Sequence, residues 1–580
     1  MSHDTKLTLE GSKLRLAISP RYTGLVRTIP GWQADRKNPG TWLAPKSFGV
    51  YLATVNTLGG EVDISPSVQA WVITRESINN IRLGVKENGL AHTEDDWWAE
   101  GLRPYQKTGA YLMALCGHFM NTDQVGTGKT VQTLAAVKAI ESFAKDPWPV
   151  LIVATNSMKY KWAEEATKWI PNCNPVVLDG STAKKTKQLE ELEGRRNLVI
   201  CNWESLRTIS RLSGYGSIAL SDKERTDGPL NYYAARTVVV DEAHRLKDPK
   251  TKQTRAAWRL LHQAEYRWAL TGTPIGNSPI DLWSILHGIS PDEWPSRSRY
   301  IDRYVEITTN FWGGVEVQGW NQGTMDEFQK LYSPISIRRT TAEVLPELPE
   351  RLPPEVRWLD MPTAQEKTYR AFEKNMIVRL DSGTLITTDV LTKVGILRTM
   401  AMATPVLDEE GRIVEVGAPS CKVAALIDLV DEMGGEPLVV FAESRRMINF
   451  AHAALTKLGV KCSLITGEVS PEGRAGHVER FQDGRTQVLL ATIGAGSEGI
   501  TLTAADTAVF LQRSFSAISN TQAEGRINRF GQTRPTRIIH LITNNTIEES
   551  VYKLTTEKTE HLQELVKDPD FVKVLLKNEK

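Results

Sequence analysis

A glycine-rich hexapeptide, VGTGKT at residues 125–130, has the composition of a loop that binds phosphate groups. Gly126 and Gly128 have no side chain, so the backbone N–H groups around them can close on phosphate oxygens. Lys129 brings a positive charge to the β- and γ-phosphates, and Thr130 brings a hydroxyl ligand for magnesium. Taken alone, this motif favours a nucleotide site, and an ordinary glycine turn is the alternative.

Two carboxylates follow an apolar stretch at TVVVDEAH, residues 237–244. A buried parallel strand would deliver Asp241 and Glu242 to the carboxyl edge of a sheet, where the ligands of open α/β sheets bind. There Asp241 would hold magnesium, directly or through water, and Glu242 would orient and deprotonate the attacking water. Acids that cap a following helix are the common alternative for an isolated Asp-Glu pair. This pair instead begins a DEAH tetrad downstream of GKT, and together the two motifs predict a nucleoside triphosphatase.

Near the end of the chain, QAEGRINRFGQ at residues 522–532 places two arginines three residues apart. On one face of a helix, Arg526 and Arg529 would most often form a solvated basic surface. With GKT and DEAH elsewhere in the chain, the spacing predicts that both guanidinium groups meet the γ-phosphate as it develops charge. Arginine suits this role because it stays charged and its planar fork engages phosphate oxygens. We expect Gln522 and Gln532 to help position that helix.

Composition limits the class of protein. The 580 residues exceed what one compact core accommodates, so we expect several domains. With 70 basic and 69 acidic residues, nucleic-acid binding would need a local basic groove, because there is no bulk positive charge. The five cysteines contain no CxxC pair, which fits free thiols in a reducing compartment and argues against a zinc module. No stretch resembles a signal peptide or a membrane span, so we expect a soluble, cytoplasmic protein without a membrane partner.

The pattern of apolar runs changes at about residue 100. Residues 1–95 contain short runs such as RLAIS, FGVYLATV and AWVITRE, which predict a β-rich or α+β accessory domain. Beyond it, apolar runs alternate with helix-length segments in two series, which predicts an α/β fold with two tandem parallel-sheet lobes. We place these lobes at 100–290 and 421–560. The less regular residues 291–420, with the proline-rich VLPELPERLPP, would form a helical or brace region between them, and 561–580 a helical tail.

The order of these motifs resembles the SWI/SNF-type branch of the superfamily-two helicase-like ATPases, whose lobes are RecA-like. The resemblance covers roughly residues 100–560 and is carried by nine segments in the order that this branch shows: GLRPYQ (101–106), VGTGKT, PVLIVATNSMKYKWAEEATKW (149–169), NWESLR, DEAHRLKDPKTKQTRA, LTGTPIGNSPIDLW, IRRTTAEVLPELP, QVLLATIGAGSEGITLTAAD (487–506) and QAEGRINRFGQ. There are two departures. The family usually has DEMGLGKT where this chain has DQVGTGKT, and Ser497 stands where glycine is usual.

The resemblance implies ATP and Mg²⁺ bound in the cleft between the lobes, with Gln106 contacting the adenine base. The implied catalytic residues are Lys129, Asp241, Glu242, Arg526 and Arg529, and Thr130 and Asp241 are the implied metal ligands. The implied nucleotide-binding residues are Gln106, Asp123, Gly126, Thr127, Gly128, Lys129 and Thr130. Residues expected to couple hydrolysis to DNA movement are Thr271, Thr273, Gly496, Gly499 and Gln522. For the two threonines, capping of the helix after Pro274 is a compatible alternative.

Polar residues that follow strands are candidates for gripping a nucleic-acid backbone without reading bases. They are Asn156, Ser157, Ser444, Thr466 and Thr492, and an ordinary turn residue is the alternative for each. Arg338 and Arg339 would either contact DNA or brace the lobes.

The N-terminal region offers a second candidate for DNA binding. IPGWQADRKNPGTWLAP at residues 29–45 resembles the HARP-type domain that precedes annealing-helicase ATPases. Trp32 and Trp42 flank the basic pair Arg36 and Lys37, an arrangement suited to stacking on bases. Two core tryptophans beside a solvated turn are the alternative.

These observations favour an ATP-driven translocase on double-stranded or branched DNA that remodels or reanneals it. We expect a monomer, nuclear if the source is a eukaryote. A strand-separating helicase, acting on DNA or RNA, is the alternative enzyme. A non-hydrolysing DNA-binding scaffold is the alternative of another class, and the intact Lys129, Glu242, Arg526 and Arg529 argue against it.

Overall fold

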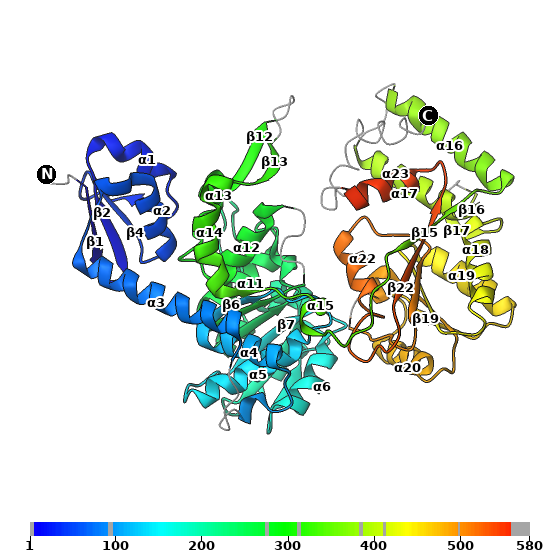
Figure 1. Cartoon of the computed structure of the whole chain (residues 1–580), viewed down its shortest axis with the longest axis horizontal. Helices are drawn as coiled ribbons and strands as arrows, with labels where there is room; N and C mark the ends of the chain where they lie inside the picture. Colours follow the sequence, from blue (N-terminus) through cyan, green and yellow to red (C-terminus); the bar gives the residue numbers. More distant parts are fainter. Residues whose placement is uncertain are drawn as a thin grey trace. The chain divides into compact units, whose positions relative to one another are not determined.

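The computed structural model describes most of the chain and divides it into two compact units, Met1–Thr340 and Thr341–Lys580. The described residues are 5–90, 97–272, 278–309, 315–381, 387–409, 413–496 and 499–557. Figure 1 shows the helices and strands of both units. The predicted tail 561–580 and three named positions, Thr273, Pro274 and Ser497, lie outside the described residues.

The accessory domain, residues 5–90, is an α+β domain at the start of the first unit. Its sheet has the order β3-β4-β2-β1-β5, in which only the β1–β5 pair is parallel. The strands are β1 (Lys6–Glu10), β2 (Lys13–Ala17), β3 (Gln33–Ala34), β4 (Thr41–Pro45) and β5 (Asp63–Ile64), and the helices are α1 (Thr23–Thr28), α2 (Phe48–Leu58) and α3 (Pro66–Asn88).

Two of the predicted strand runs in this domain are wrong. FGVYLATV forms α2, and AWVITRE lies inside the long helix α3. Ser47 caps α2 by accepting a hydrogen bond from the backbone N–H of Val50, and Pro66 begins α3 at a position where proline favours a helix. Apolar and β-branched residues occur in both strands and helices. Capping and packing against the sheet therefore determine that these two runs form helices.

The first α/β lobe is a seven-stranded parallel sheet of order β14-β6-β11-β10-β7-β9-β8. Every residue of β7 and β10 is buried, as expected for strands covered on both faces. The short stretch before the glycine-rich loop pairs as β6. The strands are β6 (His118–Asn121), β7 (Val150–Ala154), β8 (Asn174–Val177), β9 (Asn197–Asn202), β10 (Thr237–Asp241), β11 (Tyr266–Leu270) and β14 (Ser336–Ile337). The helices are α4 (Pro104–Cys116), α5 (Lys129–Ser142), α6 (Lys159–Trp169), α7 (Thr182–Glu190), α8 (Trp203–Ile209), α9 (Asp222–Arg225), α10 (Pro229–Tyr233) and α11 (Lys252–Gln263).

A small subdomain follows this sheet and anchors the accessory domain. It comprises α12 (Pro279–Ile289), α13 (Arg297–Tyr304), the hairpin β12 (Val305–Thr309) and β13 (Val315–Trp320), and α14 (Met325–Tyr332). The carboxylate of Glu293 accepts hydrogen bonds from Ser47 Oγ at 2.6 Å and from the backbone N–H of Gly49 at 2.8 Å, at the start of α2. The guanidinium of Arg299 donates to the backbone carbonyl of Trp32 at 2.8 Å. The accessory domain is therefore fixed to this subdomain by partly buried polar contacts.

The second unit is built on a six-stranded parallel sheet of order β15-β22-β21-β18-β20-β19. The predicted pair of parallel α/β lobes is thus confirmed. The strands are β15 (Glu355–Leu359), β18 (Leu438–Ala442), β19 (Cys462–Ile465), β20 (Val488–Thr492), β21 (Thr507–Phe510) and β22 (Arg537–Thr543), with a separate hairpin of β16 (Thr404–Leu407) and β17 (Ile413–Gly417). The helices are α15 (Thr341–Val344), α16 (Thr363–Asp381), α17 (Thr387–Met402), α18 (Cys421–Glu432), α19 (Arg445–Lys457), α20 (Pro471–Gln482), α21 (Ile493–Gly496), α22 (Ala517–Glu524) and α23 (Ile547–Glu557).

The region that we expected to form a separate brace, residues 291–420, is divided between the two units instead. Its first part belongs to the first unit, where β14 pairs with β6 at the edge of the sheet. Its second part belongs to the second unit, where β15 pairs with β22. Backbone hydrogen bonds of these two edge strands decide the division, and neither strand has a long apolar run that the sequence would reveal.

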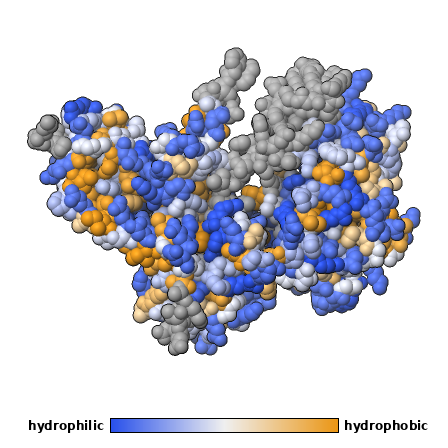
Figure 2. Space-filling view, in the orientation of Figure 1, coloured by the Kyte–Doolittle hydropathy of each residue, from blue (hydrophilic) through white to orange (hydrophobic). Residues whose placement is uncertain are grey.

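Apolar side chains reach the surface of the first unit along the accessory domain and α3 (Figure 2). Ile73 and Ile81 on α3 are 63% and 59% exposed. Among the described residues, no helix combines the length and the apolar character needed to cross a membrane.

Candidate nucleotide and nucleic-acid sites

The glycine-rich loop connects the end of β6 to the start of α5, at the carboxyl edge of the first sheet. Gly126 and Gly128 have φ angles of 96° and 80°, a region that favours glycine. A side chain at Gly128 would also collide with Gln106, because its Cβ would lie 2.5 Å from Gln106 Nε2. The ammonium of Lys129, the first residue of α5, donates to the backbone carbonyl of Asp123 at 2.7 Å. A glycine-rich turn that opens a helix is the arrangement that binds phosphate.

The carboxylate of Asp123 contacts protein groups that support this loop. This corrects the prediction that Asp123 binds the nucleotide. Asp123 is fully buried, and its two oxygens accept hydrogen bonds from Arg339 Nε at 3.0 Å and from Gln132 Nε2 at 3.1 Å. Arg339 follows β14 and also donates to the backbone carbonyl of Tyr105 at 2.6 Å. Because both carboxylate oxygens are used by protein donors, and because a carboxylate repels phosphate, Asp123 is a support. Arg339 braces the first lobe.

Gln106 and Thr127 lie against each other beside the loop. Gln106 Nε2 donates to the backbone carbonyl of Thr127 at 3.2 Å, and its Oε1 accepts from the backbone N–H of Arg103 at 3.1 Å. The hydroxyl of Thr127 is buried and donates to the carbonyl of Gln124 at 2.9 Å. These bonds place a glutamine amide next to the phosphate loop, and its contact with adenine stays a prediction.

Asp241 and Glu242 stand at the end of β10, a strand that lies between β7 and β11 in the sheet. One oxygen of the buried Asp241 carboxylate accepts from the indole N–H of Trp162 at 2.9 Å, and the other from the backbone N–H of Glu242 at 3.0 Å. Burial and the neighbouring Glu242 carboxylate raise the pKa of Asp241. Glu242 has a φ of 54°, uncommon for a residue with a side chain.

His244 connects the carboxylate of Glu242 to the end of β11. Its Nδ1 lies 3.3 Å from Glu242 Oε2 and 3.3 Å from Thr271 Oγ1. Thr271 is fully buried, and its backbone N–H donates to the carbonyl of Asn121 at 3.0 Å. The predicted coupling residue Thr271 is therefore joined to the candidate general base. His244 belongs to the DEAH tetrad, but its residue type and position alone do not reveal this connecting role.

The residues at this edge fit a magnesium ion. Thr130, the second residue of α5, and Asp241 offer a hydroxyl and a carboxylate, which are hard oxygen ligands. Among the described residues, no group of three or more His, Cys, Asp or Glu side chains could hold a metal. Magnesium with a nucleotide needs no such group, because phosphate oxygens and water complete its coordination.

The two arginines of QAEGRINRFGQ lie in the second unit and do not share a helical face as we expected. The helix α22 ends at Glu524, and both arginines follow on an irregular turn. Arg526 is 5% exposed, and both guanidinium groups donate to the backbone carbonyl of Ile500, at 3.4 Å and 3.1 Å. Burial, and then the charge of Arg526, lowers the pKa of Arg529 to about 9. The solvated-surface alternative is thus excluded for Arg526.

The other coupling residues surround this turn. The Cβ of any residue replacing Gly496 would lie 2.8 Å from the Ala491 Cβ, so the close packing of α21 on β20 requires glycine. Gly499 has a φ of 72°. Gln522 is buried, and its backbone carbonyl accepts from Arg526 Nε at 3.0 Å. Gln532 Nε2 donates to the carbonyl of Ala505 at 2.8 Å, which holds the far end of the turn.

The five candidates for backbone contact differ in exposure. Asn156 is exposed, and Ser157 and Thr492 are half-buried at the ends of β7 and β20. Ser444 caps α19 by accepting from the backbone N–H of Met447 at 3.3 Å. Thr466 is 2% exposed, so a DNA phosphate cannot reach its side chain and its assignment is corrected.

The two tryptophans of the accessory domain are core residues, which corrects the prediction that they stack on bases. Trp32 is fully buried and its indole N–H donates to Thr54 Oγ1 at 2.9 Å. Trp42 is 7% exposed and belongs to the same hydrophobic cluster. Neither ring presents a face to solvent on which a base could stack.

Comparison with known protein families decides the classification. The SNF2-related domain matches residues 105–404, and the helicase conserved C-terminal domain matches residues 421–531. The chain belongs to the SNF2-related family. The glycine-rich loop at 125–130 and Asp241–Glu242 lie in the first match, and Arg526 and Arg529 lie in the second.

Curated relatives cover most of this SNF2-related chain, which spans about half of their length. Chromodomain-helicase-DNA-binding protein 1-like of Danio rerio is 27% identical over 497 residues, covering 80% of this chain and 44% of that protein. DNA annealing helicase and endonuclease ZRANB3 of Homo sapiens is 28% identical over 468 residues, covering 79% and 40%. Among solved structures, the Sulfolobus solfataricus SWI2/SNF2 ATPase core in complex with dsDNA is 24% identical, covering 82% of this chain and 94% of that one, with a TM-score of 0.37.

Proposed function

We propose that this chain is a DNA-dependent ATPase that translocates on double-stranded or branched DNA and remodels or reanneals it. The observation that carries the proposal is the convergence of Lys129 with Asp241 and Glu242 at one edge of the first sheet, in a chain of the SNF2-related family. Carboxyl ends of parallel strands are where such sheets bind their ligands. Two of the relatives are named for helicase activity and DNA binding or annealing.

In the proposed reaction, Lys129 exchanges its contact with the loop carbonyls for the β- and γ-phosphates of ATP. Thr130 and Asp241 would hold magnesium, which would supply positive charge to the phosphates when bound. Glu242 orients the attacking water and takes its proton. Its link through His244 to Thr271 offers a route by which the state of the nucleotide is communicated to the end of β11.

Arg526 and Arg529 would stabilise the charge that develops on the γ-phosphate when the second unit closes on the nucleotide. Closure and release of the units in each cycle would move one DNA-gripping surface relative to the other. Asn156, Ser157, Ser444 and Thr492 remain candidates for those surfaces, and the chain acts as a monomer in this proposal.

The test is ATP turnover without nucleic acid and with single-stranded DNA, duplex DNA, forked DNA and RNA. We expect duplex or forked DNA to stimulate ATP turnover most. Equal turnover rates in all five conditions would contradict the proposed translocase activity. Lys129→Ala and Glu242→Gln should each abolish turnover, and Lys145→Ala, an exposed lysine beyond the end of α5, is the matched control. Turnover that survives in either variant removes the catalytic assignment.

The hairpin of β12 and β13 extends from the first unit (Figure 1). Strand displacement is therefore assayed with the same samples. An exposed hairpin of this kind favours a strand-separating helicase as the second candidate. Displacement of a strand at the rate of ATP turnover would support that alternative, and stimulation by duplex DNA without displacement supports the translocase.

A further inference from the structure

Two tryptophans of the first unit donate hydrogen bonds to Asp241, the proposed magnesium ligand. The indole N–H of Trp162 donates to the Asp241 carboxylate oxygen Oδ2 at 2.9 Å, and the indole N–H of Trp203 donates to the Asp241 backbone carbonyl at 2.9 Å. Both indole rings are fully buried, so water does not compete for either bond. Asp241 is therefore held twice, once by its side chain and once by its backbone.

The two tryptophans lie on opposite faces of the sheet. Val239 of β10 belongs to the same hydrophobic cluster as Trp162. Val240 belongs to the cluster that contains Trp203. Side chains of a strand alternate between its faces, so the side chain of Asp241 lies on the same face as that of Val239. Of the two indoles, only that of Trp162 is on the side of the carboxylate.

The contacts of the Asp241 carboxylate fix its direction and leave it able to bind a cation. Its Oδ2 accepts from Trp162, and its Oδ1 accepts from the backbone N–H of Glu242 at 3.0 Å. A carboxylate oxygen has about two acceptor positions, so after these two bonds each oxygen keeps one for a cation or for water. Groups that orient a metal-binding side chain in this way control how well the metal binds.

The entry turn of α6, Thr155 to Met158, contains two of the proposed contacts with a nucleic-acid backbone, Asn156 and Ser157. The backbone N–H of Met158 donates to the carbonyl of Thr155 at 3.1 Å. The backbone N–H of Trp162 in turn donates to the carbonyl of Met158 at 2.9 Å. The entry turn therefore continues directly into the helix, and Trp162 lies one helical turn beyond it.

The helix α6 packs beside α5, the helix that begins with Lys129 and Thr130. It therefore joins three parts of the first lobe: the entry turn at its start, α5 at its side and Asp241 through the indole of Trp162. Packed helices and buried hydrogen bonds are the elements through which one site influences another. A ligand that shifts or steadies the entry turn would act on the Asp241 carboxylate by this route.

We infer that Trp162 is a positioning residue, which orients Asp241 for magnesium and makes this orientation depend on what the entry turn of α6 holds. The indole N–H provides the first effect, and the helix provides the second. The inference deepens the proposed function and rests on it, because magnesium and DNA belong to that function. Trp203 has no such role, because it contacts Asp241 only through the backbone.

The experiment compares Trp162→Phe with Trp203→Phe in the full chain. Each substitution keeps a buried aromatic ring and removes one indole N–H that bonds to Asp241. Urea unfolding should therefore show similar losses of stability in the two variants. Binding of a fluorescent ATP analogue is measured by anisotropy without DNA, first in EDTA and then over a range of Mg²⁺ concentrations.

In Trp162→Phe, the Mg²⁺ concentration that gives half of the enhancement of nucleotide binding should rise about tenfold, as for other groups that orient a metal ligand. Trp203→Phe should keep the Mg²⁺ dependence, and both variants should keep the nucleotide affinity in EDTA within about twofold. An unchanged Mg²⁺ dependence in Trp162→Phe overturns the inference. An equal shift in the two variants also overturns it, because that result would indicate a general loosening of β10.

Turnover at saturating Mg²⁺ and saturating duplex DNA tests the link to the entry turn. Trp162→Phe should lower the stimulation by DNA about fivefold, because the coupling between the two sites is lost. Its affinity for the duplex should stay within about twofold, because the buried indole touches no DNA. Trp203→Phe should keep the stimulation, and a loss equal to that of Trp162→Phe overturns the link.

A double-mutant cycle identifies the route. Asn156→Ala/Ser157→Ala should lower the stimulation by DNA, and adding Trp162→Phe should lower it little further, because both changes interrupt one connection. Losses that multiply in the triple variant would show independent effects and overturn the link. Stimulation that is unchanged in Asn156→Ala/Ser157→Ala would overturn it as well.

Failure of the proposed function gives a different result. If the unsubstituted chain shows no stimulation by DNA, or no strengthening of nucleotide binding by Mg²⁺, the proposed function and this inference both fall. If the unsubstituted chain responds to DNA and to Mg²⁺, and Trp162→Phe responds equally, this inference alone falls.

Discussion

At the scale of single residues, burial changes how the two arginines of the second unit are interpreted, because their three-residue spacing alone favours a solvated basic surface. Arg526 and Arg529 both donate to the carbonyl of Ile500, and burial beside Arg526 lowers the pKa of Arg529 to about 9. An anion meeting this pair would relieve the repulsion between two confined cations. The proposed contact with the γ-phosphate would offset this repulsion.

We predict that Arg529→Ala leaves ATP binding largely intact and slows hydrolysis by about 10³-fold, because arginine contacts of this kind act mainly on the transition state. Arg526→Ala should slow hydrolysis too. It should also lower the free energy of unfolding by about 1–3 kcal/mol, because Arg526 is buried and bonded to Gln522. Nucleotide binding, turnover and urea unfolding are measured for both. Normal DNA-stimulated turnover in a variant would return that arginine to a structural role.

At the scale of elements, the start of α2 depends on a carboxylate from a distant segment. Glu293 accepts from Ser47 Oγ and from the backbone N–H groups of Phe48 and Gly49, and Arg75 on α3 lies 3.5 Å from it. A carboxylate at a helix N-terminus satisfies orphan donors and is favoured by the helix dipole. One residue thus joins α2, α3 and the subdomain of α12 to α14.

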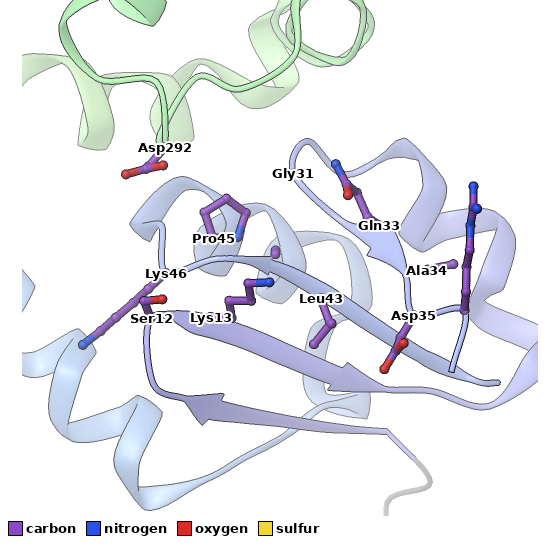
Figure 3. A pocket seen from close by; sticks show the side chains of 12 residues that line it. Ser12, Lys13, Gly31, Gln33, Ala34, Asp35, Leu43, Pro45, Lys46 and Asp292 are labelled. Carbon is purple, nitrogen blue, oxygen red and sulfur yellow. The ribbon is translucent and has the colours of Figure 1, made fainter. Parts of the chain in front are cut away.

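We predict that Glu293→Ala loosens the accessory domain at a local cost of about 1–3 kcal/mol, because several buried donors lose their acceptor. Hydrogen exchange of the α2 amides should become faster. Asp292→Ala is the matched control, since its neighbouring carboxylate lines a pocket on the accessory-domain sheet (Figure 3) and makes none of the contacts given for Glu293. Equal acceleration in the two variants would show that the segment tolerates no substitution and that capping is not the cause.

Strand β22 carries a histidine that folding keeps neutral. His540 is 1% exposed and packs near Phe510 and Tyr552. Burial, and then the charges of Arg513 and Arg351, lowers its pKa to about 3. The unfolded side chain titrates near pH 6.5, so between about 6.5 and 3 the unfolded chain binds a proton that the folded chain does not. Stability must therefore fall as the pH falls through this range.

We predict that His540→Phe reduces the loss of stability between pH 7 and pH 5 by up to about 2 kcal/mol, from about 1.4 kcal/mol for each pH unit below 6.5. Phenylalanine keeps an aromatic ring between Phe510 and Tyr552. Urea unfolding of the second unit at the two pH values gives the difference. A constant offset with an unchanged pH dependence would mean that His540 is not the titrating group.

At the scale of the whole molecule, the proposed active site draws on both units. Lys129 and Glu242 belong to the first and Arg526 and Arg529 to the second. We predict that a non-hydrolysable ATP analogue with duplex DNA slows hydrogen exchange at residues 525–532, because that turn would close on the γ-phosphate. Lys129→Ala should remove the protection. Protection that persists in this variant would come from DNA alone and would contradict a shared site.

Sequence patterns were sufficient to predict the strands and motifs whose residues are adjacent in the chain. The strands around β7, β10 and β18 are long apolar runs, and GKT and DEAH combine the residue types of their chemistry within a few positions. Elements without such a pattern were missed or wrongly predicted. The four-residue β6 and the two-residue β14 exist because neighbouring strands pair with them. The helices α2 and α3 have compositions that also suit strands.

The sequence by itself determined the order of the motifs, the α/β lobes and the phosphate loop, because each rests on residues adjacent in the chain. Only the tertiary structure decided that Asp123 supports Arg339, that His244 joins Glu242 to Thr271, and that Trp32 belongs to the core. Each of these contacts joins residues that are separated in the chain. Burial selects these partners, because it removes water as a competitor and favours a hydrogen bond within the protein for most polar groups.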